Sequence, residues 1–354
     1  MSQQELLYRY NHPLPVGAPS DRALEPSALA YESTWISEVL QQVEAEFRGQ
    51  WPRTLAEFNT ALKALLSSDQ ASPSESARFV AETATREQFR AILSEYALDG
   101  LTEAQAMFAI LPRLDPASQA PVMRILIDEF GCGNPARVHS TLYTQLLSEL
   151  DMPTALEAYL ADRCAESFAF VNVYHWLTKR APTVDYYLGA LAWTEAVIPS
   201  SFHSYVQACE RLNLQHHQYF SEHVHIDAYH ARDALLALQK RDKAVGLDVR
   251  QAWLGVLLAR RLGDDAFLEI IRRVSTAASC FQVRHGGKTW AVPLECPHRG
   301  GNLSKGHLHP QGKSITCPLH GVTFAIPSGQ RLGGPECPDL LIREMQHGSG
   351  KEGT

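Results

Sequence analysis

The sequence predicts two domains, an all-α helical bundle followed by a small all-β domain. Its length of 354 residues suits about two domains of ordinary size. Apolar residues recur at steps of three and four from residue 33 to about 275, which is the periodicity of helices that bury one face. From 276 to 345 short apolar runs alternate with dense glycine and proline, which indicates short strands joined by turns.

The predicted bundle contains roughly eight helices, because proline or glycine punctuates the joins between periodic segments. No convincing alternating strand interrupts this region. The ends differ from the rest: residues 1–32, rich in proline, serine and charge, are expected to form an irregular arm, and 346–354 a disordered tail. The clearest helical segments are WISEVLQQVEAEF, TLAEFNTALKALL, PVMRILIDEF, VDYYLGALAWTEAVI and VRQAWLGVLLARRL.

Composition and charge exclude several classes of protein. The chain is 45% hydrophobic and 20% charged, as is usual for a globular protein with a buried core. A net charge of -7 argues against nucleic-acid binding, which needs a basic surface. The sequence contains neither a membrane-length apolar run nor a secretory signal. Seven cysteines at irregular spacing indicate a reducing compartment, so we expect a cytoplasmic protein.

Two mixed cysteine–histidine pairs stand in the predicted β domain. They are Cys296-Pro-His298 and Cys317-Pro-Leu-His320, with eighteen residues between His298 and Cys317. Each pair sets a thiolate beside an imidazole in a tight loop, and glycines follow both pairs. A structural zinc site is the alternative, but zinc fingers normally place a cysteine pair before a histidine pair. The pattern therefore favours an iron–sulfur site.

These loops resemble those of Rieske [2Fe–2S] domains over about residues 278–345. The resemblance implies a cluster in which one iron takes Cys296 and Cys317 and the other takes His298 and His320. Replacing two thiolates by neutral imidazoles raises the reduction potential. We therefore expect this domain to carry electrons.

The segment HVHIDAYH, residues 223–230, is the best candidate for a second metal site. Positions i, i+4 and i+7 of a helix share one face, so His223, Asp227 and His230 project together. His225 points about 200° away. Such a stripe is costly inside a bundle without a partner, and a metal supplies one. A polar face exposed to solvent is the alternative.

A second segment places Glu129 and His139 on either side of a Gly-Cys-Gly-Asn-Pro break between two helical runs. Such a break lets the chain bend so that both side chains reach one site. The alternative is an ordinary helix end with both residues exposed. Asp128 is expected to face elsewhere. Glu103 and Glu195 are further carboxylates on otherwise apolar helical segments, although each alone is typical of a partly exposed glutamate.

The helical region resembles the heme-oxygenase-like diiron oxidases and oxygenases, also called iron-containing redox enzymes, over about residues 40–275. The motifs DEFGCGNPARVHSTLYTQLLSEL and HVHIDAYH, with TEAQ upstream, carry the resemblance. It implies two non-heme iron ions, the second weakly held, and O2 as co-substrate. Carboxylates and imidazoles suit iron, and six ligands favour two metals. The implied ligands are Glu103, Glu129, His139, His223, Asp227 and His230, with Glu195 or Glu95 as alternatives to the first.

Together the two domains predict a non-heme diiron oxygenase that receives electrons through its own Rieske module from an external ferredoxin or NAD(P)H-dependent reductase. The family resemblance makes N-oxygenation of a small amine or amino-acid-like substrate in specialised metabolism the leading expectation. Oxidative C–C cleavage or C–H hydroxylation is the enzymatic alternative. An electron shuttle or redox sensor with a non-catalytic bundle is the alternative of another class. No nucleic-acid or membrane partner is expected. A homodimer is one possible assembly.

Overall fold

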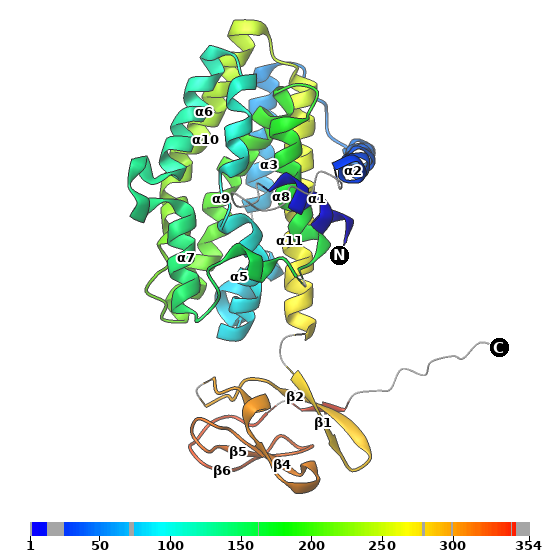
Figure 1. Cartoon of the computed structure of the whole chain (residues 1–354), viewed down its shortest axis with the longest axis vertical. Coiled ribbons are helices and arrows are strands. Elements are labelled where there is room, and N and C mark those ends of the chain that lie inside the picture. The colour runs from blue at the N-terminus through cyan, green and yellow to red at the C-terminus, as the bar shows by residue number, and fades with distance from the viewer. Residues whose placement is uncertain are drawn as a thin grey trace, which may run out of the picture. The chain divides into compact units, whose positions relative to one another are not determined.

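A computed structural model of the chain divides it into two compact units, one helical and one built from short strands (Figure 1). We describe each unit by itself. The described residues are 2–12, 25–70, 74–161, 163–277, 280–298, 300–340 and 342–344.

Eleven α-helices lie in these described residues, against the roughly eight that the periodicity predicted. Short 3-10 turns and one π-helical turn, η2 (Phe79–Thr83), connect several of them. The helices are α1 (Gln3–Asn11), α2 (Glu25–Glu46), α3 (Leu55–Gln70), α4 (Glu75–Arg78), α5 (Arg86–Gly100), α6 (Pro116–Glu129), α7 (His139–Glu149), α8 (Ala165–Lys179), α9 (Asp185–Arg211), α10 (Gln218–Val245) and α11 (Val249–Ala277).

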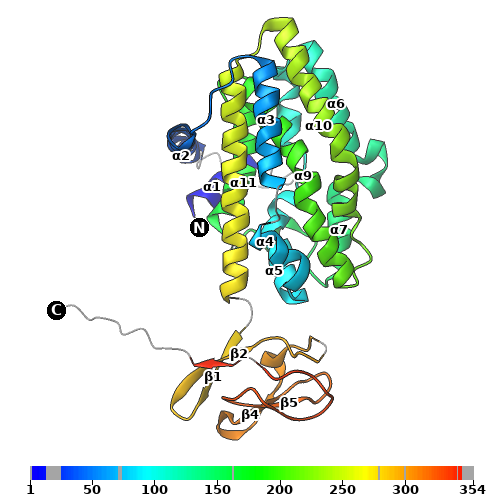
Figure 2. The same cartoon turned by 180° about the vertical axis from the view of Figure 1, so that it is seen from behind.

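The long helix α10 packs along α9 on one side and along α6 on the other (Figures 1 and 2). The core between the helices is built from aliphatic and aromatic side chains such as Leu188, Leu191 and Trp253, which are at most a few per cent exposed. None of the described helices combines the length and the apolarity that crossing a membrane requires. The expected helical bundle is therefore present, and α10 runs through the part of it that holds the candidate metal ligands.

The N-terminal region differs from its prediction. The irregular arm expected over 1–32 is wrong for Gln3–Asn11, which form α1, and for 25–32, which begin α2. The remainder of that arm, at 13–24, and the predicted tail at 346–354 lie outside the described residues.

Helix α1 forms for reasons that composition alone does not reveal. Ser2 caps it, because the Ser2 hydroxyl accepts a hydrogen bond from the backbone N–H of Glu5. Leu7 and Tyr8 are fully buried where α1 packs on α8, and the Tyr8 hydroxyl donates to the carbonyl of Leu98. A short polar helix that is stabilised by tertiary packing shows little apolar periodicity of its own.

The second unit contains two small antiparallel sheets. Strands β1 (Cys280–His285) and β2 (Lys288–Pro293) form a hairpin around Gly286 and Gly287, both at positive φ, and β7 (Arg343–Glu344) pairs with β2. This is the hairpin that the His-Gly-Gly-Lys turn predicted. The other sheet has the order β3 (His307–Leu308), β4 (Ser314–Thr316), β5 (Thr323–Ala325) and β6 (Arg331–Gly333).

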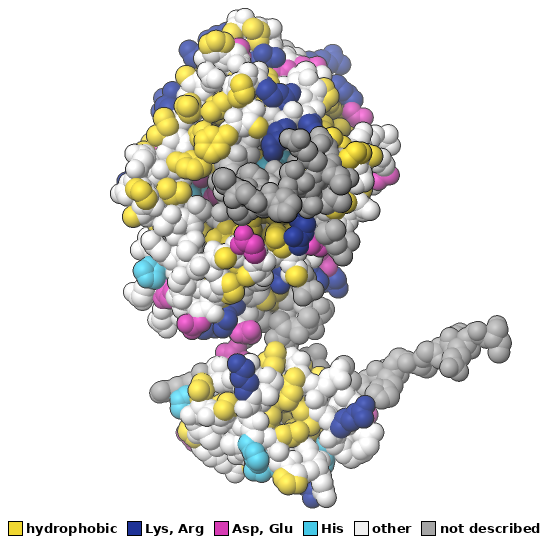
Figure 3. Space-filling model, viewed as in Figure 1, with side chains coloured by type: hydrophobic (Ala, Val, Ile, Leu, Met, Phe, Trp, Pro, Cys, Tyr) yellow, Lys and Arg dark blue, Asp and Glu magenta, His cyan; other side chains and the backbone are white. Residues whose placement is uncertain are grey.

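One face of the helical unit carries a group of exposed apolar side chains (Figure 3). Met123 and Ile127 project from α6 at an i, i+4 spacing, and Tyr229 projects from α10; each is about half exposed. Phe108, also about half exposed, packs against Phe130 at a ring-centroid distance of 5.1 Å. The outer side of α6 is therefore apolar, while its last residue, Glu129, faces the interior.

Two glycines set the closest approach between α9 and α11. A Cβ atom at Gly189 would lie 1.8 Å from the carbonyl oxygen of Ala252, and one at Gly255 would lie 1.9 Å from that of Tyr186. Both obstacles are backbone atoms, which cannot rotate away. Only glycine fits at these two positions without moving the helices apart.

We predict that Gly189→Ala lowers the free energy of unfolding of the full chain by roughly 3 kcal/mol, because overpacking against backbone forces helices apart. The matched control is Gly263→Ala in α11, where a Cβ would meet Trp193 at 3.5 Å, an ordinary contact. That change should leave stability within about 1 kcal/mol of the wild type. Urea denaturation measures both variants. Equal losses would contradict the close approach of α9 and α11.

Candidate iron centre and cluster site

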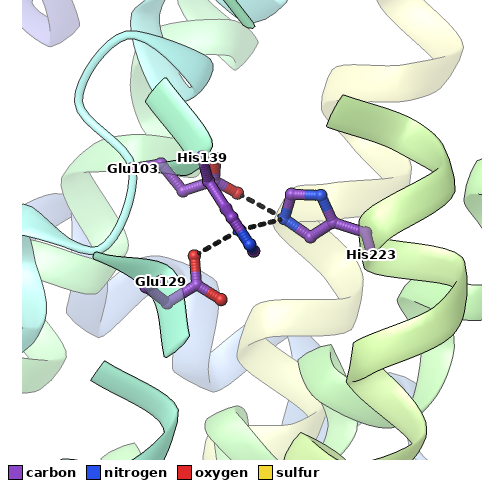
Figure 4. A group of neighbouring side chains, drawn as sticks. All are labelled: Glu103, Glu129, His139 and His223. Carbon is purple, nitrogen blue, oxygen red and sulfur yellow. Dashed lines mark hydrogen bonds and ion pairs between the residues drawn. The ribbon is translucent and has the colours of Figure 1, made fainter. Parts of the chain in front are cut away.

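Four polar side chains from four segments of the helical unit point toward one another (Figure 4). His139 Nδ1 lies 2.8 Å from Glu129 Oε2, and His223 Nε2 lies 2.8 Å from Glu103 Oε1. The two imidazoles lie 3.1 Å apart, measured from His139 Nδ1 to His223 Nε2. One potential ligand atom from each of the four residues lies within 4.8 Å of the others.

A second group adjoins the first and shares Glu129 with it. Ligand atoms of Glu129, Asp227 and His230 also lie within 4.8 Å of one another. Glu195 on α9 approaches His230 Nδ1 at 3.3 Å, and Asp128 approaches His230 Nε2 at 3.5 Å. All six residues that the sequence singled out therefore meet in one place, with Glu195 beside them.

The stripe on α10 is buried as its spacing predicted. His223, Asp227 and His230 are each at most 2% exposed, whereas His225 is exposed. His223 Nδ1 donates a hydrogen bond of 2.6 Å to the carbonyl of Tyr219, one turn earlier. That bond leaves Nε2 pointing at the group, which is how outer hydrogen bonds orient metal-binding histidines.

The turn between α6 and α7 brings Glu129 and His139 together. Helix α6 ends at Glu129 and α7 begins at His139. Gly131, at φ +63°, allows the turn, since a Cβ there would lie 2.7 Å from the backbone of Arg137. Glu129 and His139 therefore do meet across this turn, as the sequence predicted.

Three expectations need correction. Glu103 does not lie on a helix: α5 ends at Gly100, and Glu103 sits in a turn before a 3-10 helix, with Ala104 in the left-handed region. Asp128, expected to face elsewhere, approaches His230 Nε2 at 3.5 Å, because both residues of the last turn of α6 are within reach of α10. Glu95 is buried away from both groups, where it accepts hydrogen bonds from the Cys164 backbone and the Ser167 hydroxyl.

The charges within this cluster oppose one another strongly. Burial lowers the pKa of His223, but the Glu103 carboxylate, with Asp227 and Glu129, raises it well above its usual range. Burial likewise lowers the pKa of His230, while Asp227 and Glu195 raise it to about 11. The carboxylates therefore hold protons on the imidazoles when no metal is bound.

The acids respond in two ways. Burial raises the pKa of Glu129, yet the charges of His139, His223 and His230 outweigh it and lower that pKa overall. Burial raises the pKa of Glu195 to about 7, and it also raises the pKa of Asp227. The cluster is thus short of positive charge, which a bound cation would supply.

Several buried atoms of the cluster have no hydrogen bond among the described residues. They include both oxygens of Asp227, both ring nitrogens of His230 and Oε2 of Glu129, although some lie at ion-pair distance from one another. Buried polar atoms without partners are rare unless a metal or water meets them. Imidazole nitrogen and carboxylate oxygen together suit iron, so the residues present fit iron ions.

A cavity of about 710 Å³ reaches this cluster, a size typical of small-molecule sites. Glu103, Glu129, Glu195 and His223 form part of its wall. Aromatic side chains form a further part of the wall beside the cluster. The aromatic lining includes Tyr96, Tyr143, Phe170, Tyr174, Trp193 and Phe202.

In the second unit the two cysteine–histidine loops share one backbone pattern. The carbonyl of Cys296 accepts a hydrogen bond from Gly300, and that of Cys317 accepts one from Gly321. Both glycines have φ near +70°, a conformation that favours glycine. The backbone N–H of each cysteine donates to a residue five positions later, so the loops close in the same way.

The loops place their side chains at one spot. Both cysteines are buried, at 1% and 2% exposure, whereas His320 is exposed. The imidazoles of His298 and His320 lie 4.8 Å apart, at 83° to one another. Burial, with Cys317 and Cys337 nearby, raises the pKa of the Cys296 thiol to about 11. Two thiols and two imidazoles that converge in this way fit an iron–sulfur cluster.

Comparison with known proteins agrees with both domains. Residues 90–264 match the family described as "Iron-containing redox enzyme", and residues 253–343 match the Rieske [2Fe-2S] domain. The chain joins an iron-containing redox enzyme domain to a Rieske domain. Its helical domain has the heme-oxygenase-like fold, and the resemblances predicted from the motifs are confirmed.

Two curated proteins are similar to part of this chain. A nitrosourea synthase of Streptomyces achromogenes subsp. streptozoticus is 29% identical over 232 residues, 61% of this chain and 46% of that protein. A cholesterol 7-desaturase of Hemicentrotus pulcherrimus is 27% identical over 125 residues, 34% of this chain and 24% of that protein. The chain therefore spans less than half the length of either relative.

A solved structure with a heme oxygenase-like fold, from Shewanella denitrificans, aligns with 64% of this chain and 97% of its own. The TM-score is 0.47 and the identity 16%.

Sequence reasoning missed two side chains that shape the site. The Tyr219 hydroxyl donates to Glu103 Oε1 at 3.3 Å, in addition to the bond between its carbonyl and His223. Tyr219 stands four residues before His223 on α10, so helical periodicity could have placed it beside that histidine. Asp99 lines the same cavity four residues before Glu103. No sequence pattern distinguishes it from a surface acid.

We predict that His223→Ala removes most of the iron outside the Rieske cluster, since it deletes a candidate ligand from a buried group. His225→Ala is the matched control on the same helix, because His225 is exposed. Iron per chain after anaerobic reconstitution, with the cluster absorption as internal reference, measures the effect. Equal iron in both variants would remove His223 from the metal site.

We also predict that Cys317→Ser abolishes the visible absorption and the electron paramagnetic resonance of the reduced cluster, because an oxygen replaces a thiolate ligand. Cys280→Ser, at an exposed cysteine on β1, should leave both signals intact. A cluster that survives Cys317→Ser would refute the assignment of that thiol.

Proposed function

We propose that the helical domain is an O2-dependent diiron oxygenase that oxidises a small amine and receives electrons through its own Rieske cluster. The observation that carries the proposal is the pair of ligand groups that share Glu129 beside a cavity. Two sites with one carboxylate in common suit two iron ions better than one. When bound, iron supplies the capacity to activate O2 and exchange electrons.

In this proposal the first iron is held by Glu103, Glu129, His139 and His223. The second is held by Glu129, Asp227 and His230, with Glu195 able to add an oxygen. Cys296, Cys317, His298 and His320 hold the cluster.

The remaining residues of this chain orient ligands and line the cavity. The Tyr219 carbonyl fixes the ring of His223, and its hydroxyl holds Glu103. Aromatic side chains in the cavity wall offer the substrate an apolar surface beside the carboxylates. A cavity of about 710 Å³ limits the substrate to a small molecule.

N-oxygenation is the leading reaction, and the 29% identity to a protein named nitrosourea synthase supports it. C–H oxidation is the second candidate, which the likeness to a protein named cholesterol 7-desaturase favours. Both reactions need an external electron donor such as a ferredoxin or an NAD(P)H-dependent reductase. A shuttle without a catalytic bundle would not require the buried, closely packed acids and imidazoles around Asp227 and His230.

The test is iron content and oxygen uptake of the full chain after anaerobic reconstitution. We expect about four iron atoms per chain, two in a sulfur-ligated cluster and two in oxygen and nitrogen ligation by Mössbauer spectroscopy. Amine-dependent O2 uptake with ¹⁸O found on nitrogen would support N-oxygenation; ¹⁸O on carbon would indicate C–H oxidation. Iron in the cluster alone would favour the shuttle and refute the proposal.

We predict that His230→Ala lowers the substrate-dependent O2 uptake by more than about 100-fold, since even outer-sphere changes cost 10- to 100-fold. The Rieske absorption should not change, and His225→Ala should retain activity because that side chain is exposed. Turnover that persists in His230→Ala would rule out the second ligand group as a catalytic site.

A further inference from the structure

Asp99 is a carboxylate without a partner in the wall of the cavity. It lies in the last turn of α5 and lines the same space as Glu103 and His223. Among the described residues, no hydrogen bond or ion pair reaches its side chain. Asp99 is half-buried, and a carboxylate with little water around it gains from a partner of opposite charge.

The surroundings of Asp99 disfavour its negative charge. Burial raises the pKa of Asp99 to about 7; the Glu103 and Glu129 carboxylates add to the rise, and His223 opposes it. Phenol rings of Tyr96, Tyr143 and Tyr174 are near enough to feel its charge. A cation placed beside Asp99 would therefore gain an unusually strong interaction.

Asp99 is distinct from the candidate iron ligands. It belongs to neither group of ligand atoms that lie within 4.8 Å of one another. It stands four residues before Glu103, in the last turn of α5, and lines the cavity. Its carboxylate is therefore available to a molecule bound in that cavity.

Three neutral polar groups share the same cavity and also lack partners. They are His175 Nδ1, the Tyr187 hydroxyl and Trp193 Nε1, each buried and without a hydrogen bond among the described residues. Burial, with Lys179, His12 and Arg180 nearby, lowers the pKa of His175 to about 2, so its imidazole is neutral. The cavity thus offers one unpaired anion and three neutral hydrogen-bonding groups.

Charged side chains also stand elsewhere on the lining. The exposed acids Asp69, Glu82 and Asp264 line the cavity together with one arginine, Arg78. Arg260 pairs with Asp69 at 2.8 Å and lies 3.9 Å from Asp264, so these acids leave little net charge to compete with Asp99 for a cation.

We propose that Asp99 is the specificity residue that binds the cationic group of the substrate, a small molecule with an ammonium or guanidinium at one end and a neutral polar group at the other. The inference deepens the proposed function, and it rests on that function only in treating this cavity as the substrate site.

The test measures binding, without turnover, by isothermal titration calorimetry on the iron-loaded full chain under anaerobic conditions. The probes are cations with neutral isosteres: 4-guanidinobutanamide against 4-ureidobutanamide, and 5-amino-1-pentanol against 1,5-pentanediol. Wild-type protein should bind at least one cation about tenfold more tightly than its isostere. Asp99→Asn should weaken that cation by at least about tenfold, equivalent to 1.4 kcal/mol, and leave the neutral isostere unchanged.

Glu82→Gln is the matched control, because it removes the same charge from an exposed part of the same lining and should change the affinity less than about twofold. Asp99→Ala is a second test variant, with thermal unfolding and iron content as checks that each variant is folded and loaded. The proposal is overturned if the wild type binds neither cation, if Asp99→Asn binds as the wild type does, or if its loss of affinity accompanies loss of iron.

This outcome is separable from that of the proposed function. Binding is measured without O2, so cation binding at Asp99 can hold even if the reaction is not N-oxygenation. Conversely, oxygenation with unchanged binding in Asp99→Asn would sustain the proposed function and overturn this inference.

Discussion

The carboxylate of Glu129 is the point on which the helical domain depends. It lies at the last residue of α6, and imidazoles from α7 and α10 face it. A buried acid in this position needs positive charge, and protonated histidines supply it in the absence of a metal. Because Glu129 belongs to both ligand groups, its place decides whether one or two cations can be bound together.

Close packing of the helices holds the two ligand groups in place. Helix α10 carries the buried stripe and packs between α6, which presents Glu129, and α9, which presents Glu195. The contact of α9 with α11 at Gly189 and Gly255 leaves no room for a side chain between their backbones. Closely packed helices of this kind hold the side chains of a polar cluster at fixed positions inside an apolar core.

The two candidate metal sites differ in ligand chemistry and in exposure. The cluster loops bury both cysteines and leave His320 at the surface, which suits transfer of electrons through the histidine side. The helical site offers only oxygen and nitrogen atoms, buried beside an aromatic cavity. Soft ligands stabilise a redox carrier, whereas hard ligands beside a cavity suit oxidation of a bound molecule.

Local spacing in the sequence was enough to predict the cluster loops, the α10 stripe and the α6–α7 break. Each depends on residues only a few positions apart, so helix periodicity or turn chemistry determines which side chains converge. Composition failed at α1, where Leu7 and Tyr8 are buried only because a distant helix covers them. Periodicity placed Glu103 on a helix, whereas it lies in a turn that brings it to His223 across 120 positions of sequence.

The sequence by itself determined which residue types could hold metal and which of them share a helix face. Only the tertiary structure decided that the two ligand groups share Glu129, that Glu195 and Asp128 reach His230, and that Asp99 faces a cavity with no partner. The reason is physical: these contacts join separate helices, and their distances follow from how whole helices pack, which no short stretch of sequence encodes.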